Sequence, residues 1–119
     1  MPNKVETYKD LIVWQKSHQL ALTLYQSKAA KKEYESLLEV MRGLAADTAA
    51  NIALGFRNRG KKAKLHFYHA AFNSICRLNY YLTLVNDLEA LKKIDNIEED
   101  VKSIEHMLIR LIRSNLSAS

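Results

Sequence analysis

"KKAKLHFYHAAFNSICRLNYYLTLVNDLEA", residues 61–90, runs for thirty residues without a glycine or a proline. Its large apolar side chains recur mostly at three- and four-residue steps, which places them on one face of a helix. They are Leu65, Tyr68, Phe72, Ile75, Leu82 and Val85. The spacing predicts a single helix about 45 Å long, at a rise of about 1.5 Å per residue. Other helices must cover its apolar face.

Three further segments show the same period, at about residues 8–28, 33–56 and 97–115. In the first segment one face carries Leu11, Trp14, His18, Leu22 and Tyr25, and a second apolar line beside it carries Val13, Leu20 and Leu24. The stripe of the second segment is Leu37, Met41, Leu44, Thr48 and Ile52, and that of the fourth is Ile97, Val101, Ile104, Leu108 and Leu111. All three patterns are typical of amphipathic helices.

Capping residues mark two of the expected helix starts. Thr7 or Asp10 can accept hydrogen bonds from the free amides of the first segment. Asn96 with Glu99 has the spacing of a capping box at the start of the fourth.

The connections between the four segments are short, around residues 29–32, 58–60 and 91–95. Short links force consecutive helices to lie antiparallel as neighbours. The chain has only three glycines and one proline, Pro2, so it lacks the frequent turns of a β-rich protein. We therefore predict an all-α fold, an antiparallel up-down-up-down four-helix bundle, as one domain over residues 1–119.

Composition limits the compartment and the class of partner that we expect for this protein. Cys76 is the only cysteine, which excludes an intrachain disulfide and fits a reducing compartment. The opening "MPNKVETYKD" has no apolar signal-peptide core, and no uncharged apolar window reaches membrane-spanning length. We expect a cytoplasmic protein without a membrane contact. The formal charge of +5 favours acidic partners, of which nucleic acid is the usual one.

Five cations fall within eight residues at the connection between the second and third helices. They are Arg57, Arg59, Lys61, Lys62 and Lys64. Such a cluster can contact phosphates, and the start of the third helix adds exposed amides. The alternative is a solvated turn that only aids solubility. We predict a nucleic-acid-binding turn that contacts RNA or DNA.

No pattern of a metal or cofactor site is found. None of the four histidines follows a Glu at the Glu-x-x-His spacing that di-metal helical bundles use. His66, His69 and Cys76 recur on one side of the third helix, but no further ligand at close spacing supports a metal site. We expect no cofactor and no catalytic residues.

One enzymatic hypothesis stays open. Arg59 and His66 enclose six residues, and this resembles the Arg and His of HEPN-class helical-bundle ribonucleases. There an arginine could hold a phosphate while a histidine handles protons. The polar residue that those enzymes carry after the arginine is Gly60 here.

The stretch "YKDLIVWQKSHQLALTLY", residues 8–25, resembles the opening of a known family. These are four-helix-bundle proteins encoded in intervening sequences of bacterial large-subunit ribosomal RNA genes. The residues that carry the likeness are Tyr8, Lys9, Asp10, Leu11, Trp14 and Gln15, then Arg42, "NIALG" at 51–55, the basic turn, and "SICRLNYYL" at 74–82. The resemblance implies a bundle that assembles into a homopentamer. Relatives include accessory proteins of retroelements that bind nucleic acid and a reverse transcriptase, and the function of the family at large is not established.

Two positions depart from the family pattern. Leu54 stands where the family has a Glu in its Asn-Ile-Ala-Glu-Gly segment, and Arg77 stands for a Glu in the third helix. A hairpin turning near residue 60 puts Arg42 level with Arg77, so two cations would face each other where the family pairs opposite charges. These departures argue against transferring a family site to this chain.

The first and fourth segments show wider apolar bands than a bundle core needs. Such bands usually mark a protein interface, and we expect self-association. Two non-enzymatic functions thus remain: a nucleic-acid-binding or accessory module, or a protein-interaction scaffold that binds no nucleic acid.

Overall fold

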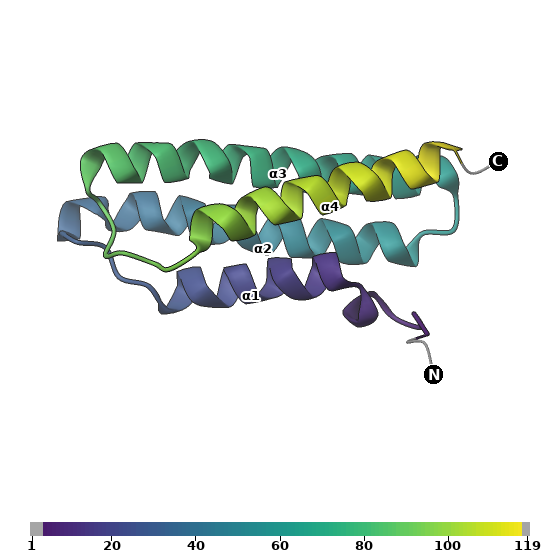
Figure 1. Cartoon of the computed structure of the whole chain (residues 1–119), viewed down its shortest axis with the longest axis horizontal. Helices are drawn as coiled ribbons and strands as arrows, with labels where there is room; N and C mark the ends of the chain where they lie inside the picture. The colour runs from purple at the N-terminus through teal and green to yellow at the C-terminus, as the bar shows by residue number, and fades with distance from the viewer. Residues whose placement is uncertain (1–3, 118–119) are drawn as a thin grey trace.

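The computed structural model describes residues 4–117, and four helices make up most of them. They are α1 (Ile12–Gln26), α2 (Glu35–Arg57), α3 (Lys61–Leu88) and α4 (Ile97–Ser117). Each helix packs on the next one along the chain, and α1 also packs on α4. Successive helices run in opposite directions (Figure 1), which confirms the predicted four-helix bundle.

The bundle is 50 Å along its longest axis, so its two ends are well separated. The α2–α3 connection and the end of α4 lie at one end, which we call the basic pole (right in Figure 1). The α3–α4 connection lies at the other end, which we call the acidic pole. No helix within residues 4–117 is long and apolar enough to cross a membrane.

The core follows the predicted stripes of α2, α3 and α4, but not that of α1. Met41, Ile52, Ile75 and Leu108 are fully buried. On α1 the buried residues are Val13, Ser17, Leu20, Ala21 and Leu24. They include Val13, Leu20 and Leu24, the apolar line that the sequence marks only as secondary. The expected face of Trp14, His18, Leu22 and Tyr25 is half-buried or exposed instead. The aliphatic and small residues of the buried line allow close packing, whereas the aromatic rings keep their polar atoms near water.

The first predicted helix, 8–28, is interrupted. A 3₁₀ turn, η1 (Tyr8–Asp10), precedes α1, and Leu11 between them has an extended backbone. Thr7 and Asp10 form a capping box, but it closes this short turn. The Asp10 carboxylate accepts from the Glu6 and Thr7 amides at 2.9 and 3.0 Å, which lowers its pKa. Thr7 is therefore a cap as predicted, but it caps the 3₁₀ turn, and α1 begins at Ile12 instead of near residue 8.

The other boundaries shift by a few residues. A 3₁₀ turn, η2 (Lys32–Tyr34), replaces the expected start of α2. α3 ends at Leu88 because Glu89 takes a left-handed conformation and the Ala90 amide donates to the Val85 carbonyl at 2.9 Å. α4 continues to Ser117.

The capping box expected at Asn96 is not found among the hydrogen bonds of residues 4–117. Asn96 has φ 62°, whereas an N-cap residue needs an extended backbone for its side chain to reach the first turn. Its carbonyl still accepts from the Asp100 amide at 2.9 Å and so begins the helix.

Candidate nucleic-acid interface

The basic turn rests on a close contact between α2 and α3. The ring of Tyr68, which is 2 % exposed, lies directly against Gly55. A Cβ atom at position 55 would come within 2.5 Å of Cε1 of that ring. Only glycine lets the two helices approach this closely just before the turn. Burial also raises the pKa of the Tyr68 hydroxyl.

Lys64 points back into this contact. Its Nζ donates to the carbonyls of Gly55 and Phe56 at 2.7 and 3.1 Å, and lies 5.7 Å from the ring centroids of Phe56 and Tyr68. Burial lowers the pKa of the ammonium. The side chain therefore caps the C-terminus of α2, where a cation complements the free carbonyls and the helix dipole.

Lys61 ties the turn to α4. Its Nζ donates to the Leu116 carbonyl at 3.0 Å, so the last turn of α4 lies beside the start of α3. The sequence grouped all five cations together, but the structure separates Lys61 and Lys64 as anchors from the other three.

Arg57, Arg59 and Lys62 are exposed at the basic pole. Within residues 4–117 none of their side chains has a hydrogen bond or an ion pair. No Asp or Glu occurs anywhere between residues 48 and 86. Three cations thus stand without local carboxylates, and such groups are available to an anionic ligand.

α4 contributes cations that the sequence analysis missed. His106, Ile109, Arg110 and Arg113 line a shallow surface hollow on this helix. No Asp or Glu follows Glu105, so all the ionisable side chains in this part of α4 are basic. His106, Arg110 and Arg113 follow one another at steps of four and three residues, and this spacing is visible in the sequence. Only the hydrogen bond from Lys61 to the Leu116 carbonyl places these side chains near the turn.

A family model described as the 23S rRNA-intervening sequence protein matches residues 9–110 of the chain. The chain belongs to this family. No curated protein and no solved structure matches the chain significantly. The matched residues include the whole basic turn. The match confirms the family resemblance seen in the sequence.

Arg42 makes a different contact from the one that the family pattern implies. The guanidinium of Arg42 donates to the carbonyls of Leu24, Tyr25 and Ser27 at 2.9, 3.3 and 2.9 Å, and it pairs with Glu39. It thus caps the C-terminus of α1 and turns away from α3. Arginine can serve several oxygens at once because its donors form a planar fork.

The two departures from the family pattern lie at the surface. Arg77 is exposed, so the expected repulsion between Arg42 and Arg77 does not arise. Leu54 is 43 % exposed and has an apolar side chain where the family has a carboxylate.

The residues of the ribonuclease hypothesis occupy different elements. Arg59 lies in the turn, and His66 lies in α3 with its ring 5.2 Å from that of Phe67. No hydrogen bond joins them in the described part of the chain. Nor do residues 4–117 contain a group of three His, Cys, Asp or Glu side chains that could hold a metal ion. Burial, with a smaller effect of Glu105, raises the pKa of the Cys76 thiol.

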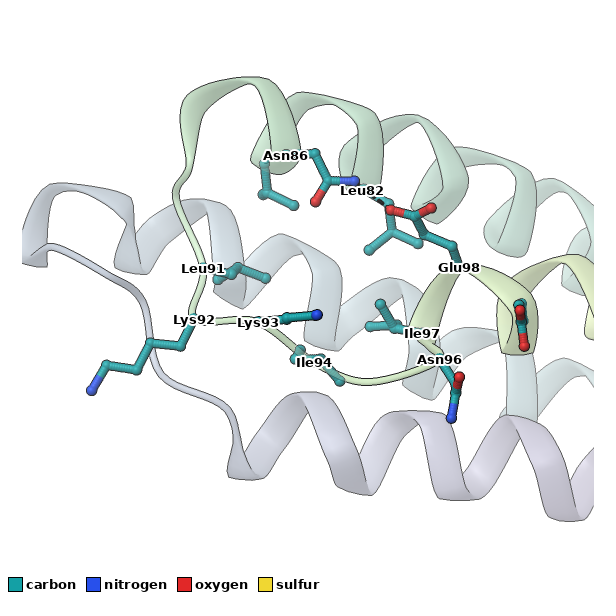
Figure 2. A pocket seen from close by; sticks show the side chains of 11 residues that line it. Leu82, Asn86, Leu91, Lys92, Lys93, Ile94, Asn96, Ile97 and Glu98 are labelled. Atoms are coloured by element: carbon teal, nitrogen blue, oxygen red, sulfur yellow. Dashed lines mark hydrogen bonds between the residues drawn. The ribbon is translucent and has the colours of Figure 1, made fainter.

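The acidic pole contrasts with this surface. Six exposed carboxylates fall between residues 87 and 100, beside Lys92 and Lys93. A hollow of about 380 Å³ lies here, with Leu82, Leu91 and Ile97 among its apolar residues. Figure 2 shows Asn86 facing Glu98, to which it donates a hydrogen bond, and Lys92 directed away from the hollow. Its mixed charges differ from those of residues 48–86, which contain no Asp or Glu.

Proposed function

We propose that this protein is a non-enzymatic nucleic-acid-binding or accessory module that holds phosphate backbone at its basic pole. One observation carries the proposal: Arg57, Arg59 and Lys62 are exposed and unpaired within a stretch that lacks carboxylates. An unpaired cation gains more free energy on binding a phosphate than a cation that already has an ion pair, because no internal ion pair has to break.

The architecture of the turn supports this role. Lys64 and the Gly55–Tyr68 contact fix the end of α2 against the start of α3, so the exposed cations sit on a rigid base. The first amides of α3 lie at the same pole, and a helix N-terminus favours an anion. Less conformational entropy is then lost when a phosphate binds.

We propose that the protein acts as a homo-oligomer, in line with the pentamer that its family resemblance implies. Ile12, Tyr25, Tyr80 and Leu116 are each more than half exposed, and they come from α1, α3 and α4. Exposed apolar groups of this size are typical of protein interfaces. In a ring the basic turn would recur on every subunit and gain avidity for one nucleic acid. Light scattering that gives a pure monomer at high concentration would refute this.

The experiment that tests the function compares two double variants by fluorescence anisotropy with a labelled structured RNA at low salt. Arg57→Gln/Arg59→Gln removes two charges from the basic pole, and Lys92→Gln/Lys93→Gln removes two from the acidic pole. The net charge of both variants is the same. We expect the first to weaken binding roughly tenfold more than the second, as two lost phosphate contacts predict.

Absence of binding by the wild type at low salt would overturn the proposal, because electrostatic attraction is strongest there. The exposed apolar groups would then favour the protein-interaction scaffold. Equal weakening by both variants would show that net charge alone drives binding, without a site at the turn.

A further inference from the structure

We infer that the phosphate site does not stop at the turn but continues as a track along the outer face of α3 and α4. This inference rests on the proposed function. It adds residues to the phosphate-binding surface and defines the shape of that surface. The track consists of two rows of exposed side chains, one on each helix.

The first row lies on α3. Lys62, His66, His69, Asn73 and Arg77 follow one another at steps of four, three, four and four residues, and all five are exposed. Such steps keep side chains on one side of a helix. The row is about 22 Å long at a rise of about 1.5 Å per residue. It begins within the basic turn and ends in the middle of the molecule.

The second row lies on α4 and consists of His106, Arg110 and Arg113, all exposed. It spans about 10 Å along the helix. Arg113 is one turn before Leu116, the residue whose carbonyl Lys61 binds. The row therefore approaches the basic turn at its C-terminal end.

Both rows point away from the core of the bundle. On α3 the buried stripe includes Ala71, Ile75 and Leu78, and on α4 it includes Val101, Ile104 and Leu108. Each row lies on the side of its helix opposite this stripe, and the two helices are direct neighbours. The rows therefore run along the outer sides of neighbouring helices and approach each other at the basic pole, where Lys61 of α3 binds the end of α4.

A hollow between α3 and α4 is lined by Asn79, Glu105 and His106, and farther from the basic pole by the carboxylates of Asp87 and Glu98. Glu105 accepts a hydrogen bond from the Asn79 amide at 2.9 Å. This contact pins α3 to α4 and occupies the carboxylate. The two rows themselves contain Lys62, Arg77, Arg110 and Arg113 with three histidines, and residues 62–77 and 106–113 contain no Asp or Glu.

The chemistry of this face fits a phosphate backbone. Lysine and arginine donate charge-assisted hydrogen bonds to phosphate oxygens, and arginine can do so with two donors. A duplex presents one phosphate per about 3.4 Å of each strand, so a 22 Å track passes several consecutive phosphates. The turn alone would meet the nucleic acid only end-on.

The test adds one variant, Arg110→Gln/Arg113→Gln, and follows binding of a labelled RNA duplex by anisotropy between 50 and 200 mM salt. Its matched control is Lys92→Gln/Lys93→Gln, which lowers the net charge equally at the other pole. Two lost contacts reduce the slope of log K against log salt by about 1.8, so the affinity lost over this range becomes about tenfold smaller. We expect this change for the α4 variant and none for the control. Circular dichroism melts verify that both variants keep the helical fold.

Three outcomes separate the track from the proposed function. A smaller slope for the α4 variant alone supports the track. A slope equal to that of the control, while Arg57→Gln/Arg59→Gln weakens binding, overturns the track and leaves the turn as the site. No binding by the wild type at 50 mM salt overturns both.

Discussion

At the scale of single residues, Gly55 has the most sharply defined role. The Tyr68 ring fills the space that a side chain at position 55 would need. The Cδ1 and Cε1 atoms of the ring would lie 2.6 and 2.5 Å from an added Cβ. Gly55→Ala should therefore destabilise the fold by about 1–3 kcal/mol, the usual cost of overpacking a core contact. Urea denaturation monitored by circular dichroism measures the change.

Gly43 is the matched control on the same helix. Nothing lies within 4 Å of the Cβ that an alanine would add there. Gly43→Ala should stabilise the protein by about 0.5–1 kcal/mol, because alanine is the better helix former. If both substitutions have the same sign, the role given to the Gly55–Tyr68 contact is wrong.

Arg42 is the second residue with a specific structural role. Arg42→Met removes three hydrogen bonds to the end of α1 and should cost about 1.5–3 kcal/mol, the range for bonds made by a charged group. Arg77→Met, at an exposed position of α3, should change stability by less than about 0.5 kcal/mol. Equal costs in chemical denaturation would contradict the role given to the hydrogen bonds between Arg42 and the end of α1.

At the scale of elements, the basic turn contains two lysines with opposite roles. Lys64→Met keeps an apolar stem but loses the donors to Gly55 and Phe56, so it should destabilise the fold by about 1–3 kcal/mol. Lys62→Met is the same chemical change two residues earlier, at an exposed side chain. It should leave stability within about 0.5 kcal/mol and weaken nucleic-acid binding. The reverse pattern in melting and anisotropy would contradict the assignment.

The elements themselves were largely predictable from the sequence. The apolar stripes of α2, α3 and α4 and the scarcity of glycine and proline indicated the bundle. A helix of this length is stabilised mainly by burial of one apolar face, and that face is visible in the sequence as a stripe. The break at Leu11 was not predictable, since Thr7 and Asp10 can cap either a turn or a helix. The choice between the two apolar lines of α1 depends on packing against other helices.

The candidate site was predictable only in part. The cluster at residues 57–64 is visible as charge, but its division into anchors and free cations depends on tertiary contacts. Lys64 lies eight or nine residues along the chain from the carbonyls that it binds, across the turn. Arg110 and Arg113 could not be placed beside the start of α3 before the packing of α4 on α3 was known.

At the scale of the whole molecule, the carboxylates are unevenly distributed along the chain. Residues 48–86 and 106–117 contain no Asp or Glu, whereas six exposed carboxylates fall between residues 87 and 100. We expect the protein to bind RNA without cleaving it, so structured RNA should stay intact after long incubation with the wild-type protein. Cleavage that His66→Ala abolishes would contradict this and restore the ribonuclease hypothesis.

The most direct test of the central claim is the salt dependence of RNA-duplex binding by the wild-type protein, measured by fluorescence anisotropy. Arg57, Arg59 and Lys62 alone predict a slope of log K against log salt near −2.7, at about 0.9 per neutralised phosphate. With Arg77, Arg110 and Arg113 added, the slope approaches about −5.4. A value in this range is the predicted result. No binding at low salt, or a slope near zero, would contradict the account.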